Sequence, residues 1–343
     1  MAIANLSLHG QLSAKSVISM QKDEKNATIK FGLIGESEGN GHPFSWTAIV
    51  NGYWHDRMRF CGYSSISAYL AQQRWDEPHI PNASISHIWT QDINRTRFIA
   101  NTCKDVSPVT SISQIMSQVD AFIIARDDYI HNFKFAKELA AEGKPILFDK
   151  QIAQTSAAAL EIIRYCRESI CPIFTGSALA HDPNLPLVRW LKDSSVHTLE
   201  AKTPKKWRNY GVHIVDPIIT SLEICNLMSF KSIEVLESTE IITCVHILVD
   251  RPSMPPLVIR LVSDNNYEGG FSFCAHDKSG IKKLTYIVND PFNAFKSYLQ
   301  NYTNFCALLV DPGNRERAND KQESCINHYL MVQSVIDKAA LSS

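Results

Sequence analysis

The 343 residues of this chain are enough for two domains of ordinary size, and a hydrophobic content of 45% provides each with a core. A formal net charge of −1 gives no ground for binding nucleic acid or an anionic membrane surface. The 9 cysteines form no CxxC pair, so we expect no metal site and reduced thiols. No apolar run reaches the ~18 residues of a membrane helix, and the N-terminus lacks a signal-peptide pattern. We therefore expect a cytoplasmic protein that does not enter the membrane.

The first half of the chain alternates short apolar runs with helical segments. Residues 1–27 precede the first strand and are predicted to form an extension, partly helical around 14–20. Predicted strands and helices then alternate, with strands at 29–34, 85–90, 120–125 and 145–148 and helices from Pro43 and over 131–142. Such repetition implies parallel pairing with right-handed crossovers. It predicts a Rossmann domain, a doubly wound parallel α/β sheet that binds a dinucleotide, over residues 28–150.

The second half begins with a further predicted helix at 155–168 and a strand at 173–176. Longer strand candidates separated by turn residues follow, then two closing helices: strands at 233–236, 241–249, 257–263, 270–276 and 282–288, helices at 292–309 and 321–339. This order predicts an α+β domain with a mostly antiparallel open sheet over residues 151–343. Its strands are predicted to carry apolar residues on both faces, among them Ile259, Leu261, Phe271 and Phe273. This favours a homodimer or homotetramer, unless the closing helices cover the sheet.

A glycine-containing turn follows the first predicted strand. Its candidate cofactor-binding residues are Gly35, Ser37, Gly39, Asn40, Gly41 and His42. A turn between a strand and a helix is where a dinucleotide fold binds pyrophosphate, and Pro43 suits the first turn of the following helix. However, the spacing departs from GxGxxG, and Glu36 and Glu38 would repel a pyrophosphate unless both side chains point away. The turn alone favours a cofactor loop and a flexible surface turn equally.

Two segments carry a family resemblance. Residues 119–125 read VDAFIIA, His131 follows, residues 140–145 read AAEGKP and residues 149–151 read DKQ. Further on, residues 210–216 read YGVHIVD. Together they resemble the pattern VDAVIIATP…H…ALEAGKHV…EKP and the GxHxxD segment of the glucose–fructose oxidoreductase / inositol dehydrogenase family (Gfo/Idh/MocA). The resemblance covers roughly residues 29 to 335, with strong motifs only at 119–151 and 209–216.

The resemblance implies an NAD- or NADP-dependent oxidoreductase. Such an enzyme transfers hydride between nicotinamide and a carbinol or ketone carbon of a sugar, cyclitol or nucleotide-sugar, and its open sheet commonly builds dimers or tetramers. By position, Lys150 matches the lysine that touches nicotinamide and substrate, His213 the active-site histidine and Asp216 the carboxylate three residues later. The resemblance also implies cofactor contacts from Ala125, Arg126, His131 and Lys150 and substrate contacts from Asn209, Tyr210 and His213.

Elementary chemistry supports these roles and leaves some alternatives open. A lysine at the carboxyl edge of a parallel sheet can hydrogen-bond a substrate hydroxyl, and a histidine with an ordinary pKa of about 6.5 can exchange its proton near neutrality. Asp216 precedes a proline, so it could instead cap a helix. Asp92, which ends a predicted strand, would accept from the ribose hydroxyls and slightly favours NAD. Arg95 and Arg97 could instead meet the 2′-phosphate of NADP.

Departures from the family pattern keep a second function open. Asn209 stands where the family usually has an aspartate, and an amide cannot stabilise a protonated His213 as a carboxylate does. The alternative is therefore a non-catalytic NAD(P)-binding regulatory protein on the same fold. An insertion at 51–82, rich in aromatic residues and arginines, would cap the adenosine end of the cofactor, pack on a partner subunit, or form an ordinary surface helix.

Overall fold

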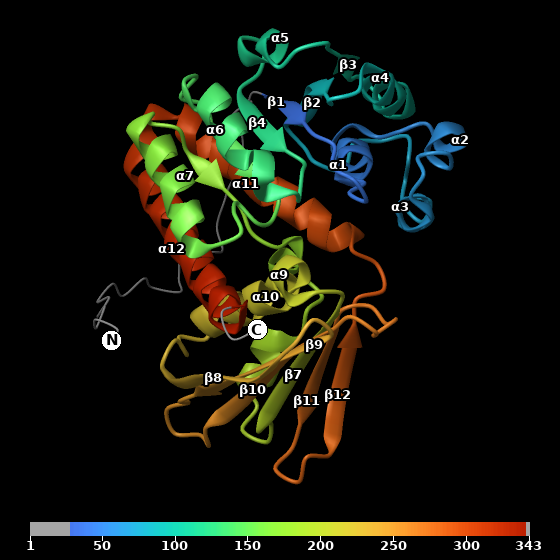
Figure 1. Cartoon of the computed structure of the whole chain (residues 1–343). Helices are drawn as coiled ribbons and strands as arrows, with labels where there is room; N and C mark the ends of the chain where they lie inside the picture. Colours follow the sequence, from blue (N-terminus) through green and yellow to red (C-terminus); the bar gives the residue numbers. More distant parts are fainter. Residues whose placement is uncertain (1–27, 341–343) are drawn as a thin grey trace.

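The computed structural model describes residues 28–340 and contains two sheets, which Figure 1 shows one above the other. The predicted extension at 1–27 therefore lies outside the described residues. Six parallel strands form the first sheet: β1 (Ile29–Ile34), β2 (Ala83–Trp89), β3 (Ser107–Pro108), β4 (Ala121–Ile124), β5 (Ile146–Phe148) and β6 (Ile173–Phe174). Their order, β3-β2-β1-β4-β5-β6, is the doubly wound order. The fold class predicted for the first half is confirmed.

Helices cover both faces of the first sheet. One face carries α1 (His42–Asn51), α4 (Ile93–Thr102) and α11 (Phe292–Val310); the other carries α5 (Ser113–Met116), α6 (Asn132–Ala140), α7 (Ser156–Glu168) and α12 (Arg315–Ala340). All four residues of β4 are buried, because this strand lies between β1 and β5 and beneath both helical layers. The turns after β1, β4 and β5 meet at the carboxyl edge of the sheet, where ligands of such folds bind.

The second sheet is mostly antiparallel, as predicted. Its order is β12-β11-β7-β10-β9-β8, made of β7 (Thr198–Pro204), β8 (Phe230–Ser238), β9 (Ile242–Val249), β10 (Leu257–Asp264), β11 (Ser272–His276) and β12 (Lys282–Ile287). Only β7 and β10 run parallel. We did not predict β7 from the sequence. Its buried positions are taken by Leu199, Ala201 and Thr203, two of which are small or polar and give a weak apolar signal.

One face of the second sheet is covered by α8 (Leu187–Leu191), α9 (Trp207–Tyr210), α10 (Val212–Ile224) and the end of α12. Ile259, Leu261 and Phe273 lie on this face and are fully buried. The prediction that these side chains form an exposed apolar face is therefore wrong, because the helices cover them. Phe271 is half-buried beside the same core. In Figure 1 the strands turn their other face away from these helices.

The first sheet continues past residue 150, where we placed the domain boundary from the sequence. β6 pairs with β5 and α7 packs on α6, because the strand–helix alternation runs for one more unit before the pattern changes. The last two helices also return to this sheet, α11 against β1 and α12 against β6 and α7. The other end of α12 contacts α9 and β8, so this single helix connects the two sheets (Figure 1).

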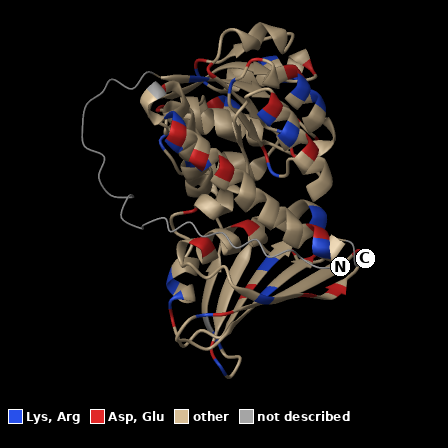
Figure 2. Cartoon of the chain, turned by 90° about the vertical axis from the view of Figure 1, so that its left-hand side faces the viewer, with Lys and Arg blue, Asp and Glu red and all other residues tan. Residues whose placement is uncertain are grey.

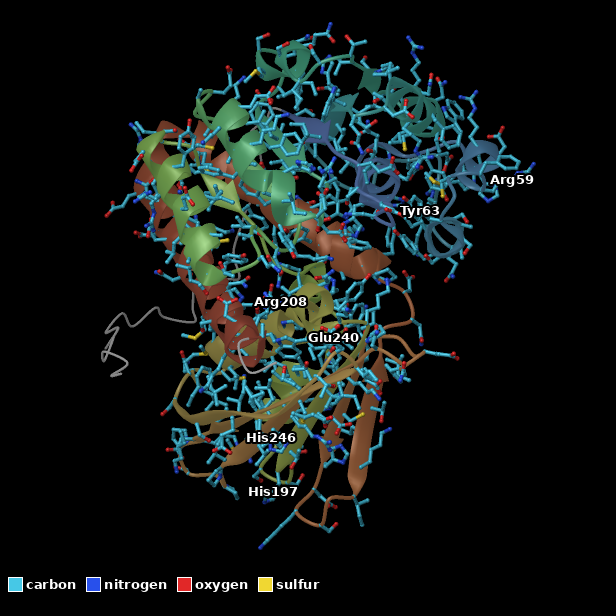
Figure 3. The ribbon with its side chains drawn as sticks, viewed as in Figure 1. Arg59, Tyr63, His197, Arg208, Glu240 and His246 are labelled. Atoms are coloured by element: carbon cyan, nitrogen blue, oxygen red, sulfur yellow. The ribbon has the colours of Figure 1, made fainter. Side chains whose placement is uncertain are left out.

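The insertion at 51–82 forms α2 (His55–Met58) and α3 (Ser64–Leu70) on the outer side of α1. Because α3, α4, α11 and β2 all pack against α1, every residue of this helix except His42 is buried. Figure 3 shows Tyr63 on the side of the insertion that faces α1 and Arg59 on its outer side. Three short 3-10 turns complete the described elements: η1 (Tyr129–His131), η2 (Ala178–His181) and η3 (Pro312–Asn314).

Charged side chains of both signs are interspersed over both domains on the face shown in Figure 2. This distribution agrees with the formal net charge of −1. Within residues 28–340, no helix is both long enough and apolar enough to cross a membrane.

Candidate active site

A cavity of about 360 Å³ opens at the carboxyl edge of the first sheet, where residues of both domains line it. Seven residues predicted from the sequence share its wall: Gly39, Asn40, Gly41, His42, Lys150, Tyr210 and His213. The glycine turn and the two proposed proton-handling residues therefore meet in one place. Aromatic side chains complete the wall, among them Tyr69, Phe271 and Phe295.

The glycine turn is fixed to the end of β5 by Asp149, which is 2% exposed. One carboxylate oxygen, Oδ2, accepts from Asn40 Nδ2 at 3.0 Å and lies 2.5 Å from His42 Nδ1. The side-chain oxygen of Asn40 accepts from the His42 backbone N–H at 2.8 Å, at the start of α1. Gly39 has φ +75° and open space where a Cβ would lie. The turn is thus anchored on one side and open at the glycine that faces the cavity.

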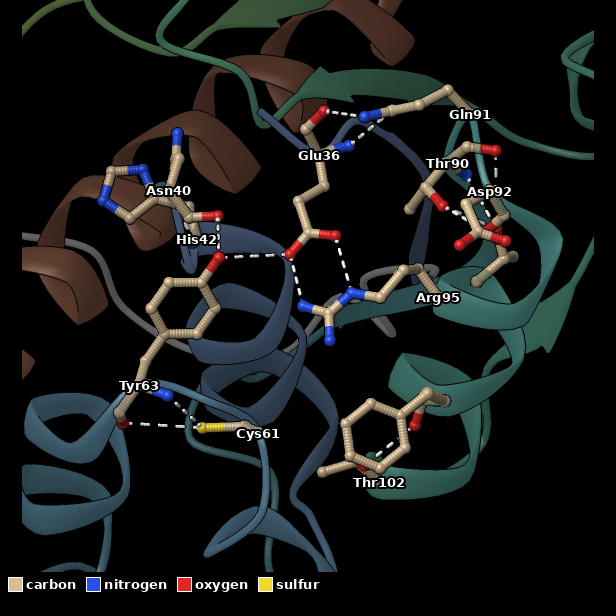
Figure 4. A network of polar contacts seen from close by, with 12 residues as sticks. Glu36, Asn40, His42, Cys61, Tyr63, Thr90, Gln91, Asp92, Arg95 and Thr102 are labelled. Carbon is tan, nitrogen blue, oxygen red and sulfur yellow. Dashed lines mark hydrogen bonds and ion pairs between the residues drawn. The ribbon is translucent and has the colours of Figure 1, made fainter. Parts of the chain in front are cut away.

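Glu36 does not present a free charge to the glycine turn (Figure 4). Arg95 Nε and Nη2 donate to its two carboxylate oxygens at 2.9 and 2.6 Å, and the Tyr63 hydroxyl donates to one of them at 3.2 Å. This pairing neutralises the carboxylate that argued against pyrophosphate binding, while Glu38 is exposed. It also engages Arg95, which we had considered as a partner for the 2′-phosphate of NADP.

The insertion supplies part of the cavity wall. Tyr63, Ser65, Ile66 and Tyr69 line the cavity beside the glycine turn. A Cβ at Gly41 would lie 2.3 Å from Ile66 Cδ1 and 2.8 Å from Tyr63 Cδ2, so only glycine allows this close approach. The Tyr63 hydroxyl also donates to the Asn40 carbonyl at 3.3 Å. The insertion is therefore built into the site.

Lys150 is 6% exposed at the end of β5. Its Nζ lies 3.3 Å from Asp127 Oδ2 and 5.2 Å from the centre of the Tyr210 ring. Burial raises the pKa of Asp127, but the Lys150 charge and a hydrogen bond from Ser37 outweigh burial and hold that pKa below its ordinary value. Sequence reasoning missed Asp127, because its partner Lys150 lies 23 positions away. Ser37 acts through this aspartate, donating to Asp127 Oδ1 at 2.8 Å.

His213 lies in the first turn of α10, with its ring beside those of Tyr210 and Phe271. Burial lowers its pKa well below the ordinary value, and the nearby charges of Lys150, His42 and Lys205 lower it further. Its Nδ1 lies 2.9 Å from the Ser177 hydroxyl. Asn209, which we predicted to contact substrate, is exposed on α9 and does not line the cavity.

Asp216 lies inside α10 and not at its start, so it does not cap this helix. Its carboxylate is 3% exposed and does not line the cavity. Oδ2 accepts from the Ser177 backbone N–H at 2.6 Å, and Oδ1 lies 2.8 Å from His328 Nε2. Asp216 therefore fixes the backbone behind His213, and its predicted catalytic role stays a prediction.

A second hollow, of about 390 Å³, lies beside the ends of β2 and β4. Trp89, Gln91, Arg126 and His131 are among its lining residues. Arg126 is buried and donates to the Glu36 carbonyl at 2.6 Å and to Gln91 Oε1 at 3.0 Å.

Two other predicted cofactor residues have structural roles at this edge. Asp92 is exposed, and its carboxylate caps α4 by accepting from the Asn94 N–H at 2.8 Å. Ala125 is buried, and a Cβ at Gly35 would lie 2.7 Å from its carbonyl oxygen. Gly35 is therefore required for the close packing of β1 on β4.

The residues present fit a dinucleotide. The open turn at Gly39 lines the same cavity as Lys150 and His213, so a ligand lying against the turn reaches both residues. The hollow beside Trp89 suits an adenosine moiety, because an aromatic face and polar groups line it together. Among residues 28–340, no cluster of histidine, cysteine and carboxylate side chains could hold a metal ion.

The two sheets and the cavity that both domains line define a two-domain fold, a doubly wound parallel sheet followed by a mostly antiparallel sheet. No protein-family model matches the chain, and no curated protein matches it. Solved structures do. A dehydrogenase from Chromobacterium violaceum has 11% identity and a TM-score of 0.61, covering 92% of this chain and 96% of its own. The apo scyllo-inositol dehydrogenase from Lactobacillus casei has 11% identity and a TM-score of 0.57, covering 91% of this chain and 97% of its own.

A third solved structure is GenD2 from gentamicin A biosynthesis, in complex with NAD. It has 9% identity and a TM-score of 0.59, covering 94% of this chain and 97% of its own. These neighbours confirm, at the level of the fold, the resemblance to inositol dehydrogenases that the sequence motifs indicated.

Proposed function

We propose that this protein is an oxidoreductase that uses NAD or NADP to interconvert a carbinol and a ketone on a sugar, cyclitol or nucleotide-sugar. The observation that carries the proposal is the shared cavity, in which the glycine turn, Lys150 and His213 line one wall. The polar groups of Asp127 and Tyr210 beside the aromatic rings of Tyr69 and Phe271 suit a polyhydroxylated ligand, which has both hydroxyl groups and apolar C–H faces.

The chain's own residues would manage the proton of the reacting oxygen. The cofactor, when bound, supplies or accepts the hydride. Lys150 Nζ, held by Asp127 at 3.3 Å, would donate a hydrogen bond to the substrate oxygen and stabilise its developing negative charge. His213 would exchange a proton with the same oxygen through the ring nitrogen that Ser177 leaves free. Burial of both residues strengthens these interactions, because water screens them less.

Titration calorimetry with NAD⁺, NADH, NADP⁺ and NADPH tests the first half of the proposal. At a ligand concentration one hundred times the dissociation constant, the preferred form should stabilise the fold by about 2.7 kcal/mol. The absence of both heat and a melting shift with all four forms would refute it.

Turnover with cyclitols, sugars and nucleotide-sugars, followed by absorbance of the reduced nicotinamide, tests the second half. Lys150→Ala should lower kcat by about 10²–10⁴-fold while the protein stays folded. Lys137→Ala on the outside of α6 is the matched control. Tight cofactor binding with no turnover of any of these substrates would instead favour a non-catalytic regulatory protein. That second function stays open because Asn209 replaces the aspartate that would pair with His213.

A further inference from the structure

The partner of His213 is a hydroxyl group. Ser177 Oγ lies 2.9 Å from His213 Nδ1, and Ser177 is fully buried at the start of η2. Among the described residues, no carboxylate forms an ion pair with His213. The residue that holds the ring thus comes from the segment after β6, 36 positions earlier in the chain.

Ser177 is itself held from two sides. Its backbone N–H donates to Asp216 Oδ2 at 2.6 Å, and its Oγ accepts from the Leu179 N–H at 3.2 Å. These bonds fix the backbone and leave His213 Nδ1 as the one further partner of this oxygen in the described part of the chain, and the hydroxyl can donate to a bare Nδ1 or accept from Nδ1–H. The position of Ser177 is therefore set by the carboxylate of Asp216.

His328 of α12 fixes Asp216 in turn. Its Nε2 lies 2.8 Å from Asp216 Oδ1, and its Nδ1 lies 2.9 Å from Glu223 Oε2. Because both ring nitrogens face carboxylates, both donate, and the ring is an imidazolium. Burial lowers the pKa of His328, but the hydrogen bonds and charges of Asp216 and Glu223 raise it to about 10. The other titratable groups near this cluster include Lys321, Cys325, Tyr298 and His181, and burial lowers the pKa of His181 to about 4.

We propose that Ser177 is the positioning residue that orients His213, and that Asp216 and His328 act through Ser177 to hold it. The inference rests on the proposed function, because it assigns His213 a proton to exchange. The Ser177 hydroxyl would then take the place of the aspartate that the family pattern has at position 209, where this chain has Asn209. Neither Asp216 nor His328 lines the cavity.

A hydroxyl partner has a consequence that a carboxylate would not have. A carboxylate only accepts, so it would fix the hydrogen of His213 on Nδ1 and stabilise the imidazolium. With the Ser177 hydroxyl donating to Nδ1, neutral His213 carries its hydrogen on Nε2, which remains for the cavity. In this form His213 donates a hydrogen bond from Nε2–H to a substrate oxygen. Transfer of a proton to that oxygen requires the imidazolium, which forms when His213 takes up one proton from solvent. Its Nδ1–H then donates to the serine oxygen, and loss of the Nε2 proton to the substrate leaves a neutral ring with its hydrogen on Nδ1, so the Ser177 hydroxyl is the donor in one state and the acceptor in the other.

The tautomer of His213 can be measured without turnover, by ¹⁵N NMR of the imidazole rings in the cofactor-free protein, with His213→Gln for assignment. We expect the Nε2–H form at pH 7. Ser177→Ala should remove this preference, and Ser177→Asp should convert the ring to the Nδ1–H form and raise the His213 pKa. Ser334→Ala, on the exposed side of α12, should change neither.

Kinetics provide the second measurement. Ser177→Ala should lower kcat by about 10–100-fold with a smaller change in KM, the usual cost of losing a group that orients a functional histidine. Ser177→Thr, which keeps the hydroxyl, should restore most of it. His328→Gln should shift the His213 tautomer in the same direction as Ser177→Ala. Because residue 328 lies more than 100 positions from His213 in sequence, this variant keeps the test valid if Ser177→Ala fails to fold.

Two results would overturn the inference. One is an Nδ1–H tautomer of His213 in the unaltered protein, and the other is an Nε2–H tautomer that stays the same in both Ser177→Ala and His328→Gln. The NMR measurement tests the role of Ser177 even if the protein turns over no substrate. A lack of turnover would count against the proposed function and not against the role of Ser177.

Discussion

The His328 imidazolium should make the stability of this protein depend on pH in a defined window. Its pKa is raised to about 10 in the folded chain, against an ordinary 6.5 when unfolded. A raised pKa stabilises the fold fully below pH 6.5, and this contribution is lost as the pH rises toward 10. The difference of 3.5 units corresponds to at most about 5 kcal/mol. Glu223 is 41% exposed and solvent screens its share, so we expect about 2–3 kcal/mol.

The perturbation is His328→Gln, followed by urea denaturation between pH 6 and pH 10. The variant should be less stable than the unaltered protein by about 2–3 kcal/mol at pH 6, and the difference should shrink steadily above pH 7. Other groups titrate in both proteins and cancel in the difference. His55→Gln, an exposed histidine whose ring lies beside Trp75, is the control and should show no such trend. A loss of stability that stays constant from pH 6 to pH 10 would show that His328 is not an imidazolium in the fold.

Three further predictions follow from other contacts. Arg95→Met should remove the cation that pairs with Glu36 beside the glycine turn and so weaken cofactor binding about tenfold, measured by calorimetry. Adding Glu36→Gln to this variant should restore the affinity. If the affinity does not return, the electrostatic account is refuted. Asn51→Ala should lower the free energy of unfolding by about 2–4 kcal/mol in urea denaturation. The Asn51 side chain exchanges two hydrogen bonds with the Ile85 backbone, at 2.8 and 2.9 Å, and donates to the Lys104 carbonyl at 2.8 Å. Asn94→Ala, at an exposed position, is the control, and an equal loss of stability in both variants would contradict this role of Asn51. We propose a homodimer or homotetramer through the face of the second sheet that α8–α10 and α12 leave uncovered. On this face Val262 lies between the ion pairs Arg260–Glu200 and Lys202–Asp264, and Val258 lies on the other side of Arg260. Light scattering at a monomer mass of 38.6 kDa would refute it.

The sequence was sufficient for features that depend on residues close together in the chain. Apolar runs such as 120–125 marked the central strands, because a strand buried on both faces needs apolar residues at every position. Alternation of strands and helices then required parallel pairing, which brings the ends of β1 and β5 to one edge. The convergence of the glycine turn and Lys150 was predictable on these grounds, and His213 from the family resemblance.

Only the tertiary structure decided which groups neutralise, hold or cover these residues. The charge of Glu36 is compensated by Arg95, 59 positions away, and the partner of His213 is Ser177, which no local pattern distinguishes from other serines. The same holds for His328, which is separated from Asp216 by 112 positions. Hydrophobic periodicity reports which face of an element is buried, but not which distant element covers it. Hydrogen bonds and ion pairs act over about 3 Å, so they are determined only once the whole chain path is fixed.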